Sequence, residues 1–376
     1  MLENFNKTSI ILDNFKCKID HQFRVGWLTL NRVCNLRCPW CYARDTHYSQ
    51  ENTMDFETAK KIIDILVEAN VRKVILIGGE PTLYPDIFKV LDYCYEKNLN
   101  TTIATNGVVF ANKDILQQYK DHHVTKISMS IKAFNDHDYE QYTGLNSFSK
   151  VLEAVKNLVE LDMNFALSTV ISSYSIDNLL EGLIMLKNAG APKINMSFCY
   201  NYDEDGSSIE EYKNSICGNP YILAHKYQSI YFNLKKAMGD CKFILSQTLP
   251  CCVWDPNFLA LMIKDKTIAK PCQLVCGTGL LFDTQANLIP CNAMYPIKLG
   301  TLGKDFNDFN SLKAHLATED VTKQYNILRG VSDPKCLQCN LRNFCGGGCS
   351  NFWTNFNMQD LENFKKEYEA LKLTKK

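Results

Sequence analysis

Three cysteines stand close together near the start of the chain, in the sequence Cys34-Asn-Leu-Arg-Cys38-Pro-Trp-Cys41. Thiolates are the usual ligands of iron–sulfur clusters, and three of them on one short loop suit three corners of a four-iron cluster. The fourth iron would have no cysteine ligand from this loop, so it could bind a small molecule. The alternative is a zinc site, but zinc usually takes four ligands from two separated pairs. The spacing therefore favours a cluster with one open iron.

A second concentration of cysteine lies in the C-terminal third of the chain. Of the 17 cysteines, ten fall in three compact groups, and seven of these ten follow residue 270. The last group has the spacing C-x2-C-x5-C-x3-C and contains Gly346, Gly347 and Gly348, which permit positive φ and close approach to a bulky cluster. A zinc ribbon is the alternative for this stretch. The cysteines concerned are Cys272, Cys276, Cys291, Cys336, Cys339, Cys345 and Cys349.

The elements that must position the first loop alternate between strand-like and helix-like patterns. Short runs rich in β-branched residues recur from Val25 to about Asn201, and amphipathic segments lie between them. One such segment has Asp55 as its N-cap. Six β/α units predict an α/β fold with a parallel sheet, a partial (β/α)6 barrel, because a closed barrel needs eight strands. The predicted strands are Gly26–Asn31, Lys73–Ile77, Asn100–Thr105, Lys126–Ile131, Phe165–Ser172 and Lys193–Cys199.

Changes of pattern divide the chain into four parts. The ranges are an N-terminal extension (1–24), the partial barrel (25–215), a helical connector (216–265) and a cysteine-rich domain with a C-terminal helix (266–376). Lys plus Arg and Asp plus Glu each number 41, and this balance argues against binding to nucleic acid or to an anionic membrane. Neither a signal peptide nor an apolar run of ~18 residues is present, so we expect a soluble, cytoplasmic protein.

A second signal is the sequence Gly78-Gly79-Glu80-Pro81, which follows the second predicted strand. Two glycines permit close approach of a ligand to the backbone, and Glu80 offers a carboxylate to an ammonium group. The Cys34–Cys41 loop, with Trp40 before its last cysteine, and this GGEP element together resemble the radical S-adenosylmethionine (SAM) superfamily. The resemblance implies that S-adenosylmethionine chelates the open iron of a [4Fe–4S] cluster held by Cys34, Cys38 and Cys41. It implies cofactor contacts from Trp40, Gly78, Gly79, Glu80, Pro81, Asn106 and Ser130.

Two of these contacts have simpler interpretations. Asn106 and Gly107 also suit an ordinary turn, and Ser130 also suits a capped strand end. The resemblance further implies that the reduced cluster cleaves the cofactor to a 5′-deoxyadenosyl radical, which removes a hydrogen atom from a substrate. An electron donor such as flavodoxin or ferredoxin would reduce the cluster.

The C-terminal cysteines resemble those of the SPASM subfamily, whose members carry auxiliary iron–sulfur clusters. The resemblance implies one auxiliary cluster at Cys272, Cys276, Cys291 and Cys349, and a second at Cys336, Cys339 and Cys345. This chain departs from the pattern in three places: Ala286 replaces a glycine, the Cys272-x3-Cys276 spacing is short, and no cysteine follows Cys349. Cys251 or Cys252 could replace Cys272. The second site would then hold a cluster with an open iron, a cluster with a non-cysteine ligand such as Asp360, or no cluster.

Members of this subfamily mostly modify peptides or proteins. We therefore expect an oxidoreductase that forms a crosslink or an oxidised residue on a ribosomally made precursor peptide. The alternative substrate is a small-molecule metabolite, and a third possibility is a zinc-binding interaction protein. Asn292 stands where sulfatase-maturating relatives have an Asp base, which argues against that activity. Candidate acid–base groups are Lys132, Tyr200 and Asp203, each of which also suits a solvated position.

Overall fold

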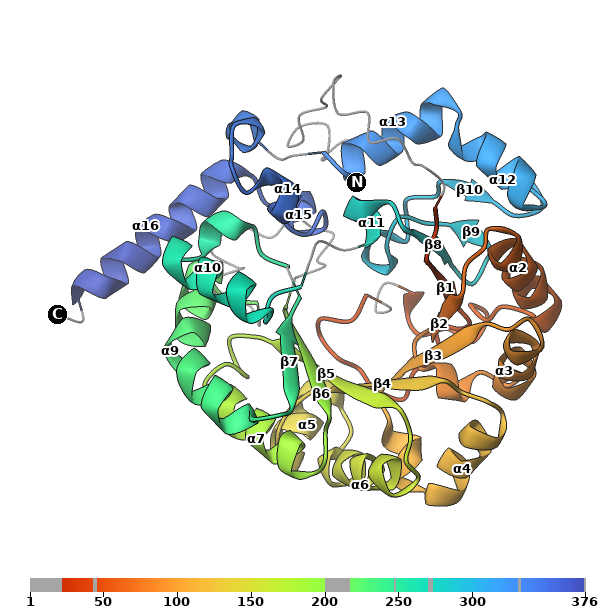
Figure 1. Cartoon of the computed structure of the whole chain (residues 1–376), viewed down its shortest axis with the longest axis horizontal. Helices are drawn as coiled ribbons and strands as arrows, with labels where there is room; N and C mark the ends of the chain where they lie inside the picture. Colours follow the sequence, from red (N-terminus) through yellow and green to blue (C-terminus); the bar gives the residue numbers. More distant parts are fainter. Residues whose placement is uncertain are drawn as a thin grey trace.

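The computed structural model describes residues 22–42, 46–199, 217–246, 248–269, 273–330 and 333–374. Within these ranges the strands form one sheet in the order β10-β9-β8-β1-β2-β3-β4-β5-β6-β7. Figure 1 shows the sheet bent into an arc, with α2, α3, α4, α6, α7 and α9 along its outer side. The arc does not close, and its two edges are β10 and β7.

All six predicted strands form, and the predicted α/β fold with a partial barrel is confirmed. Neighbouring strands from β1 to β6 pair in parallel, as expected for successive β/α units. The observed strands are β1 (Val25–Thr29), β2 (Lys73–Ile77), β3 (Asn100–Thr105), β4 (Lys126–Ile131), β5 (Phe165–Ile171) and β6 (Lys193–Phe198). The helices between them are α2 (Phe56–Glu68), α3 (Ile87–Glu96), α4 (Lys113–Asp121), α5 (Asp136–Thr143), α6 (Phe148–Glu160) and α7 (Leu179–Asn188), with two short 3-10 turns, η2 (Pro81–Leu83) and η3 (Val108–Ala111).

Helix α2 illustrates how local sequence fixes these units. The Asp55 side chain accepts a hydrogen bond from the backbone N–H of Thr58 at 2.8 Å, as the predicted N-cap requires. The buried face of the helix includes Ile62, Ile63 and Leu66. A Cβ atom at Gly26 of β1 would lie 2.4 Å from the Leu66 side chain, so the helix packs directly on the strand.

Two further parallel strands extend the arc beyond the six predicted ones. Strand β7 (Lys242–Leu245) pairs with β6, and β8 (Gly279–Phe282) pairs with β1. Strand β7 lies in the connector that was expected to be helical, between α9 (Pro220–Met238) and α10 (Pro256–Asp265). Four residues are too few to show a strand period, which is why the sequence did not reveal it.

The C-terminal cysteine-rich part contains a short hairpin joined to the barrel sheet. In it, β8 is followed by β9 (Asn287–Leu288) and β10 (Gly300–Thr301). The turn before β9 holds Ala286 at φ 58°, a left-handed conformation in which a glycine has no steric cost. The remaining elements are η4 (Cys251–Val253), α11 (Gln273–Cys276), η5 (Asn292–Met294), α12 (Phe309–Leu316), α13 (Glu319–Leu328), η6 (Pro334–Leu337), α14 (Arg342–Cys345), α15 (Phe352–Asn355) and α16 (Met358–Thr374).

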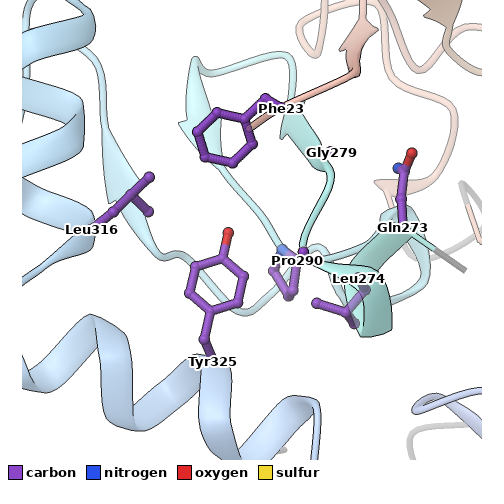
Figure 2. Close-up of a pocket in the computed structure, with 8 residues that line it drawn as sticks. Phe23, Gln273, Leu274, Gly279, Pro290, Leu316 and Tyr325 are labelled. Atoms are coloured by element: carbon purple, nitrogen blue, oxygen red, sulfur yellow. The ribbon is translucent and has the colours of Figure 1, made fainter. Parts of the chain in front are cut away.

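The C-terminal part packs firmly on the barrel at two places. Figure 2 shows Phe23, Leu274, Leu316 and Tyr325 converging where β1 begins, around a gap of only ≈ 10 Å³. This volume is at the lower limit for one water molecule. Helix α16 lies along α9, where the Asn219 amide donates to the Phe364 carbonyl at 3.0 Å. Helix α16 thus buries one face, on which Leu361 and Phe364 lie.

No helix in the described ranges is both long enough and apolar enough to cross a membrane.

Candidate active site

The loop that carries Cys34, Cys38 and Cys41 leaves the carboxyl end of β1. Its shape is fixed by main-chain hydrogen bonds, from Arg37 N to Thr143 O at 2.8 Å and from Cys41 N to Cys38 O at 3.1 Å. The Arg37 guanidinium donates back to the Cys34 carbonyl at 2.6 Å. The loop therefore presents its three thiols from one ordered turn at the end of the barrel where β/α proteins place their sites.

Burial governs the protonation of two of these thiols, those of Cys34 and Cys38. It raises the pKa of Cys34 to about 12 and the pKa of Cys38 to about 11. The nearby Lys132 ammonium acts in the opposite direction on Cys38. Buried thiols of this kind become thiolates when a cation replaces their protons, as metal binding does. The structure thus places Lys132, predicted as an acid–base candidate, next to the cysteine loop.

The glycines of the GGEP turn are required by the chain itself. Gly79 N donates to Asn31 O at 2.9 Å, and Glu80 N donates to Val33 O at 2.7 Å. A Cβ atom at Gly79 would lie 2.3 Å from the Arg32 carbonyl oxygen, and one at Gly78 would lie 2.2 Å from Asn31 Oδ1. The sequence suggested that a ligand approaches these glycines. The structure shows that the chain leading into the cysteine loop, at Asn31, Arg32 and Val33, lies directly against these glycines.

The Glu80 carboxylate is enclosed by donors of the chain. It accepts hydrogen bonds from Thr82 Oγ1 at 2.7 Å, Thr105 Oγ1 at 2.6 Å and Asn106 N at 2.7 Å. Only 1% of Glu80 is exposed. Burial raises the pKa of this carboxyl group, while the hydrogen bonds lower it. In this structure the carboxylate joins the ends of β2 and β3, and its contact with the cofactor's ammonium group stays a prediction.

Replacing Glu80 by Gln should lower the free energy of unfolding by about 2–3 kcal/mol, because hydrogen bonds to a buried charge are strong. The Gln amide has one acceptor and one NH2 group, and the NH2 group would face either the Asn106 N–H or the threonine donors. Urea unfolding measures the change. The control is Glu57→Gln on α2, where Glu57 makes only an exposed ion pair with Lys60, and it should change stability by less than about 0.5 kcal/mol. Equal urea midpoints for the Glu80→Gln variant and the original protein would contradict this role.

Two other predicted cofactor contacts, Asn106 and Ser130, also lie at the carboxyl ends of strands. Asn106 Nδ2 donates to Asn35 Oδ1 in the cysteine loop at 2.8 Å, so it ties β3 to that loop. Ser130 Oγ lies 3.2 Å from Ser168 Oγ on β5, its partner in register, and Ser168 is in turn the partner of Asn195 on β6. These three strand positions are half-buried, whereas Ile131 beside them is fully buried. They form a polar strip along one face of the sheet.

Trp40 packs near Tyr142, with ring centroids 6.4 Å apart. Pro81 begins η2 directly after Glu80. Trp40 belongs to the cysteine loop itself, and the contact of Trp40 and Pro81 with the cofactor stays a prediction. Tyr200 and Asp203 lie outside the described residues.

Sequence reasoning missed Arg32, which precedes the cysteine loop by two residues. Its guanidinium lies between the rings of Tyr42 and Tyr295, 5.5 and 5.4 Å from their centroids. Arg32 is 1% exposed, and its two terminal nitrogens make no hydrogen bond to any residue that the structure describes. An unpaired buried guanidinium is costly, so this position fits a bound anion. The signal in the sequence was a charged residue at the end of an apolar strand.

Tyr42 connects the cysteine loop to the C-terminal part. Its hydroxyl donates to the Gly78 carbonyl at 3.1 Å. Burial raises the pKa of Tyr42, and the neighbouring thiols of Cys41, Cys34 and Cys291 raise it further. Cys291, a predicted auxiliary ligand, therefore lies close to the first cysteine group.

The remaining auxiliary cysteines lie on short helices and turns on either side of β8, with Cys276 before it and the other described ones after it. Cys276 ends α11 and Cys291 precedes η5, while Cys272 lies outside the described residues. Cys349 N donates to the Thr248 carbonyl at 3.3 Å, which brings the last cysteine group beside the segment before η4. The Asn292 side chain accepts a hydrogen bond from Thr29 Oγ1 at 3.2 Å, at the carboxyl end of β1.

The last cysteine group contains one strongly activated thiol. Hydrogen bonds from the Cys251 side chain and from backbone N–H groups lower the pKa of Cys345 to about 6. Those N–H groups include Gly347 and Gly348, which have φ values of 83° and 84°. The glycines thus let the backbone fold over the Cys345 sulfur. The sequence predicted that they permit such conformations.

Cys199 and Cys217 form a buried pair that the sequence did not predict, with sulfur atoms 3.3 Å apart. In the described part of the chain, no three His, Cys, Asp or Glu side chains gather closely enough to hold a single metal ion. Each thiolate of a four-iron cluster binds a different iron, so its ligands lie farther apart than those of one ion. The buried cysteine thiols and the unpaired Arg32 guanidinium fit a group of that kind.

Comparison with known proteins agrees with this geometry. Residues 28–182 match the model of the radical SAM superfamily. An AdoMet-dependent heme synthase from Methanosarcina barkeri (strain Fusaro / DSM 804) is 26% identical over 345 residues, covering 86% of this chain and 90% of that protein. The strand order and the cysteine loop define a radical SAM barrel with a cysteine-rich C-terminal part. Residues 28–182 of this chain, which include the cysteine loop and the GGEP turn, form a radical SAM domain.

Two solved structures share the fold over most of the chain. Streptococcus suis SuiB bound to its precursor peptide SuiA has a TM-score of 0.65 at 18% identity, covering 87% of this chain and 72% of SuiB. Native anSMEcpe with bound AdoMet has a TM-score of 0.67 at 17% identity, covering 93% and 98% of the two chains. At this level of identity the likeness shows the fold.

Proposed function

We propose that this enzyme modifies a ribosomally made peptide, in which it removes a hydrogen atom and leaves a crosslink or an oxidised residue. S-adenosylmethionine, when bound at a cluster held by Cys34, Cys38 and Cys41, would supply the radical that removes the hydrogen atom. Auxiliary clusters at the C-terminal cysteines could accept the electron that the substrate radical loses. The electron donor would be a flavodoxin or a ferredoxin.

The residues of the barrel would hold and orient the cofactor. Ser130, Ser168 and Asn195 offer hydroxyl and amide groups along one strip, suited to a nucleoside. Asn106 positions the cysteine loop through Asn35. Lys132 lies beside Cys38, where its positive charge stabilises a thiolate ligand.

A single observation carries the choice of a peptide over a compact metabolite. Two cavities of ≈ 540 and ≈ 580 Å³ lie side by side along the β8–β9 turn and share Thr284 and Gln285. Each cavity alone would suffice for a small ligand. Together they are lined from Arg32 to Lys61 by the segment 46–58 and the hairpin, an arrangement that would suit an extended chain. Their lining is mostly polar and can pair with peptide groups. The shared fold with SuiB, solved with a precursor peptide, supports this choice.

The test is anaerobic incubation with S-adenosylmethionine, reductant and peptides encoded beside this gene. We expect a peptide whose mass falls by that of two hydrogen atoms, because one leaves as an atom and the other as a proton with an electron. Peptide deuterated at the reacting carbon should pass deuterium to 5′-deoxyadenosine. Unchanged peptide mass, together with 5′-deoxyadenosine formation that no peptide accelerates, would contradict the proposal.

The second candidate substrate is a small molecule, and one observation favours it. The relative that matches along 86% of this chain is a heme synthase, whereas the peptide-bound neighbour SuiB is similar in fold alone. The Arg32 guanidinium would suit a carboxylate of such a substrate. The same incubation with carboxylated metabolites in place of peptides separates the two candidates.

A further inference from the structure

The second auxiliary cluster lacks a fourth cysteine in the C-terminal sequence, since none follows Cys349. We propose that Cys252, from the turn η4 between β7 and α10, is the fourth ligand of a [4Fe–4S] cluster at Cys336, Cys339 and Cys345. The site joins a residue of the connector to the C-terminal cysteine group. It does not depend on which substrate the enzyme modifies.

Three separate contacts hold η4 against the last cysteine group. Cys251 N donates to Cys345 Sγ at 3.3 Å. Three residues before Cys251, the Thr248 carbonyl accepts from Cys349 N at 3.3 Å. A Cβ atom at Gly348 would lie 2.9 Å from Pro250 N, so the glycine-rich loop lies directly on this segment. The cysteine pair and the last cysteine group are therefore one structural unit, although 94 residues separate Cys251 from Cys345.

Of the two adjacent cysteines, Cys252 is the better placed. Its thiol lies close enough to interact electrostatically with the thiols of all three C-terminal ligands, Cys345, Cys336 and Cys339. The Cys251 thiol is already in hydrogen-bonding contact with Cys345, and Cys251 is only 4% exposed. Ligands of a four-iron cluster bind different irons and must be spread around it. A sulfur in contact with Cys345 cannot take a separate iron without moving, whereas Cys252 is exposed and outside the core.

Asp360, the non-cysteine candidate, has another role. Its carboxylate accepts a hydrogen bond from Asn357 N at 2.9 Å, and its own N–H donates to Asn357 Oδ1 at 3.1 Å. These reciprocal bonds fix the start of α16. The carboxylate is therefore used at a helix end, and Cys252 is the candidate that the structure brings to the cluster site.

Iron content and electron paramagnetic resonance test this site without a substrate. Three four-iron clusters would give about twelve irons per chain, and the Cys336→Ala/Cys339→Ala double variant should lower this to about eight. The Cys252→Ala variant should lose between one and four irons. After mild oxidation, any cluster it keeps should add a second three-iron signal to the one that the open-iron cluster at Cys34, Cys38 and Cys41 already gives in the original protein.

The matched control is Cys251→Ala, which should keep its iron and spectrum because this residue is not a ligand. The Cys252→Ser variant controls for misfolding, because serine keeps the shape of the side chain and offers an oxygen atom as a weaker ligand. If Cys252→Ala retained full iron and an unchanged spectrum, or if Cys251→Ala alone lost iron, the assignment would be wrong. Stoichiometric zinc in the original protein that Cys252→Ala removes would also overturn it.

Discussion

Replacing Cys34, Cys38 and Cys41 together by Ala is expected to reduce 5′-deoxyadenosine formation to the background of the reductant alone. Cys291 lies near this loop on the other side of Tyr42. It is itself a predicted auxiliary ligand, so we do not expect it to replace the three removed thiols. A cluster with three ligands removed has no anchor in the loop, so about four irons per chain should be lost as well. Chromatography of the nucleoside product and an iron assay measure both effects.

The control for this experiment is Cys94→Ala. Cys94 lies on the buried face of α3, outside the three cysteine groups, and burial alone raises its pKa to about 12. This variant should lose about 1 kcal/mol of stability from the small cavity and keep its iron and its cofactor cleavage. Continued 5′-deoxyadenosine formation by the triple variant at the original rate would contradict the assignment of the cluster to this loop.

The strands of the barrel were predictable because each is fixed by residues next to it in sequence. Runs such as Lys73–Ile77 are rich in branched residues and lie between turns. The observed limits of β2, β3 and β4 are those predicted, and those of β1, β5 and β6 differ by one or two residues. The Asp55 cap is similarly local. Strand β7 has four residues and β8 lies among cysteines, so neither carries a period that could be recognised.

The cysteine loop was predictable for the same reason, since its ligands lie within eight residues of one another. What the sequence could not show depends on contacts between distant segments. The Arg32 guanidinium meets Tyr295, which belongs to the C-terminal part. The sequence allows Cys251 or Cys252 to replace Cys272, but the fold places them beside Cys345, which spacing alone could not reveal. Only the three-dimensional path of the connector decides this.

Contacts between segments far apart in sequence place the first cysteine loop and Cys291, which belong to two different predicted clusters, beside the same edge of the barrel. Tyr42 lies between the first cysteine loop and Cys291, and Arg32 stacks on Tyr42 from the side of Tyr295. The positive charge of Arg32 would stabilise the electron-rich state of a neighbouring cluster. The strand β8, which pairs with β1, carries the hairpin to this position. The parallel pairing of β8 with β1 thus determines how close the two cysteine groups lie.

Replacing Gly79 by Ala should be more damaging than the size of one methyl group suggests. Its Cβ would lie 2.3 Å from the Arg32 carbonyl oxygen and 2.4 Å from that of Val33. Neither oxygen belongs to a flexible side chain, and the Val33 carbonyl accepts the hydrogen bond from Glu80 N. Relief of the clash must separate the GGEP turn from the cysteine loop. We expect a loss of about 3 kcal/mol in unfolding free energy, near the upper end for overpacking, with impaired cluster loading.

Gly144→Ala provides the contrast that separates the clash from the general cost of replacing a glycine. Gly144 ends α5 at φ 74°, and a Cβ there would meet nothing within 4 Å. The left-handed backbone alone should cost about 1 kcal/mol, with iron content unchanged. If denaturant unfolding gave the two variants equal losses, the close approach of the two main chains would not be what requires Gly79. A larger loss for Gly79→Ala, accompanied by lower iron content, would show that the GGEP turn supports the cysteine loop through direct backbone contact.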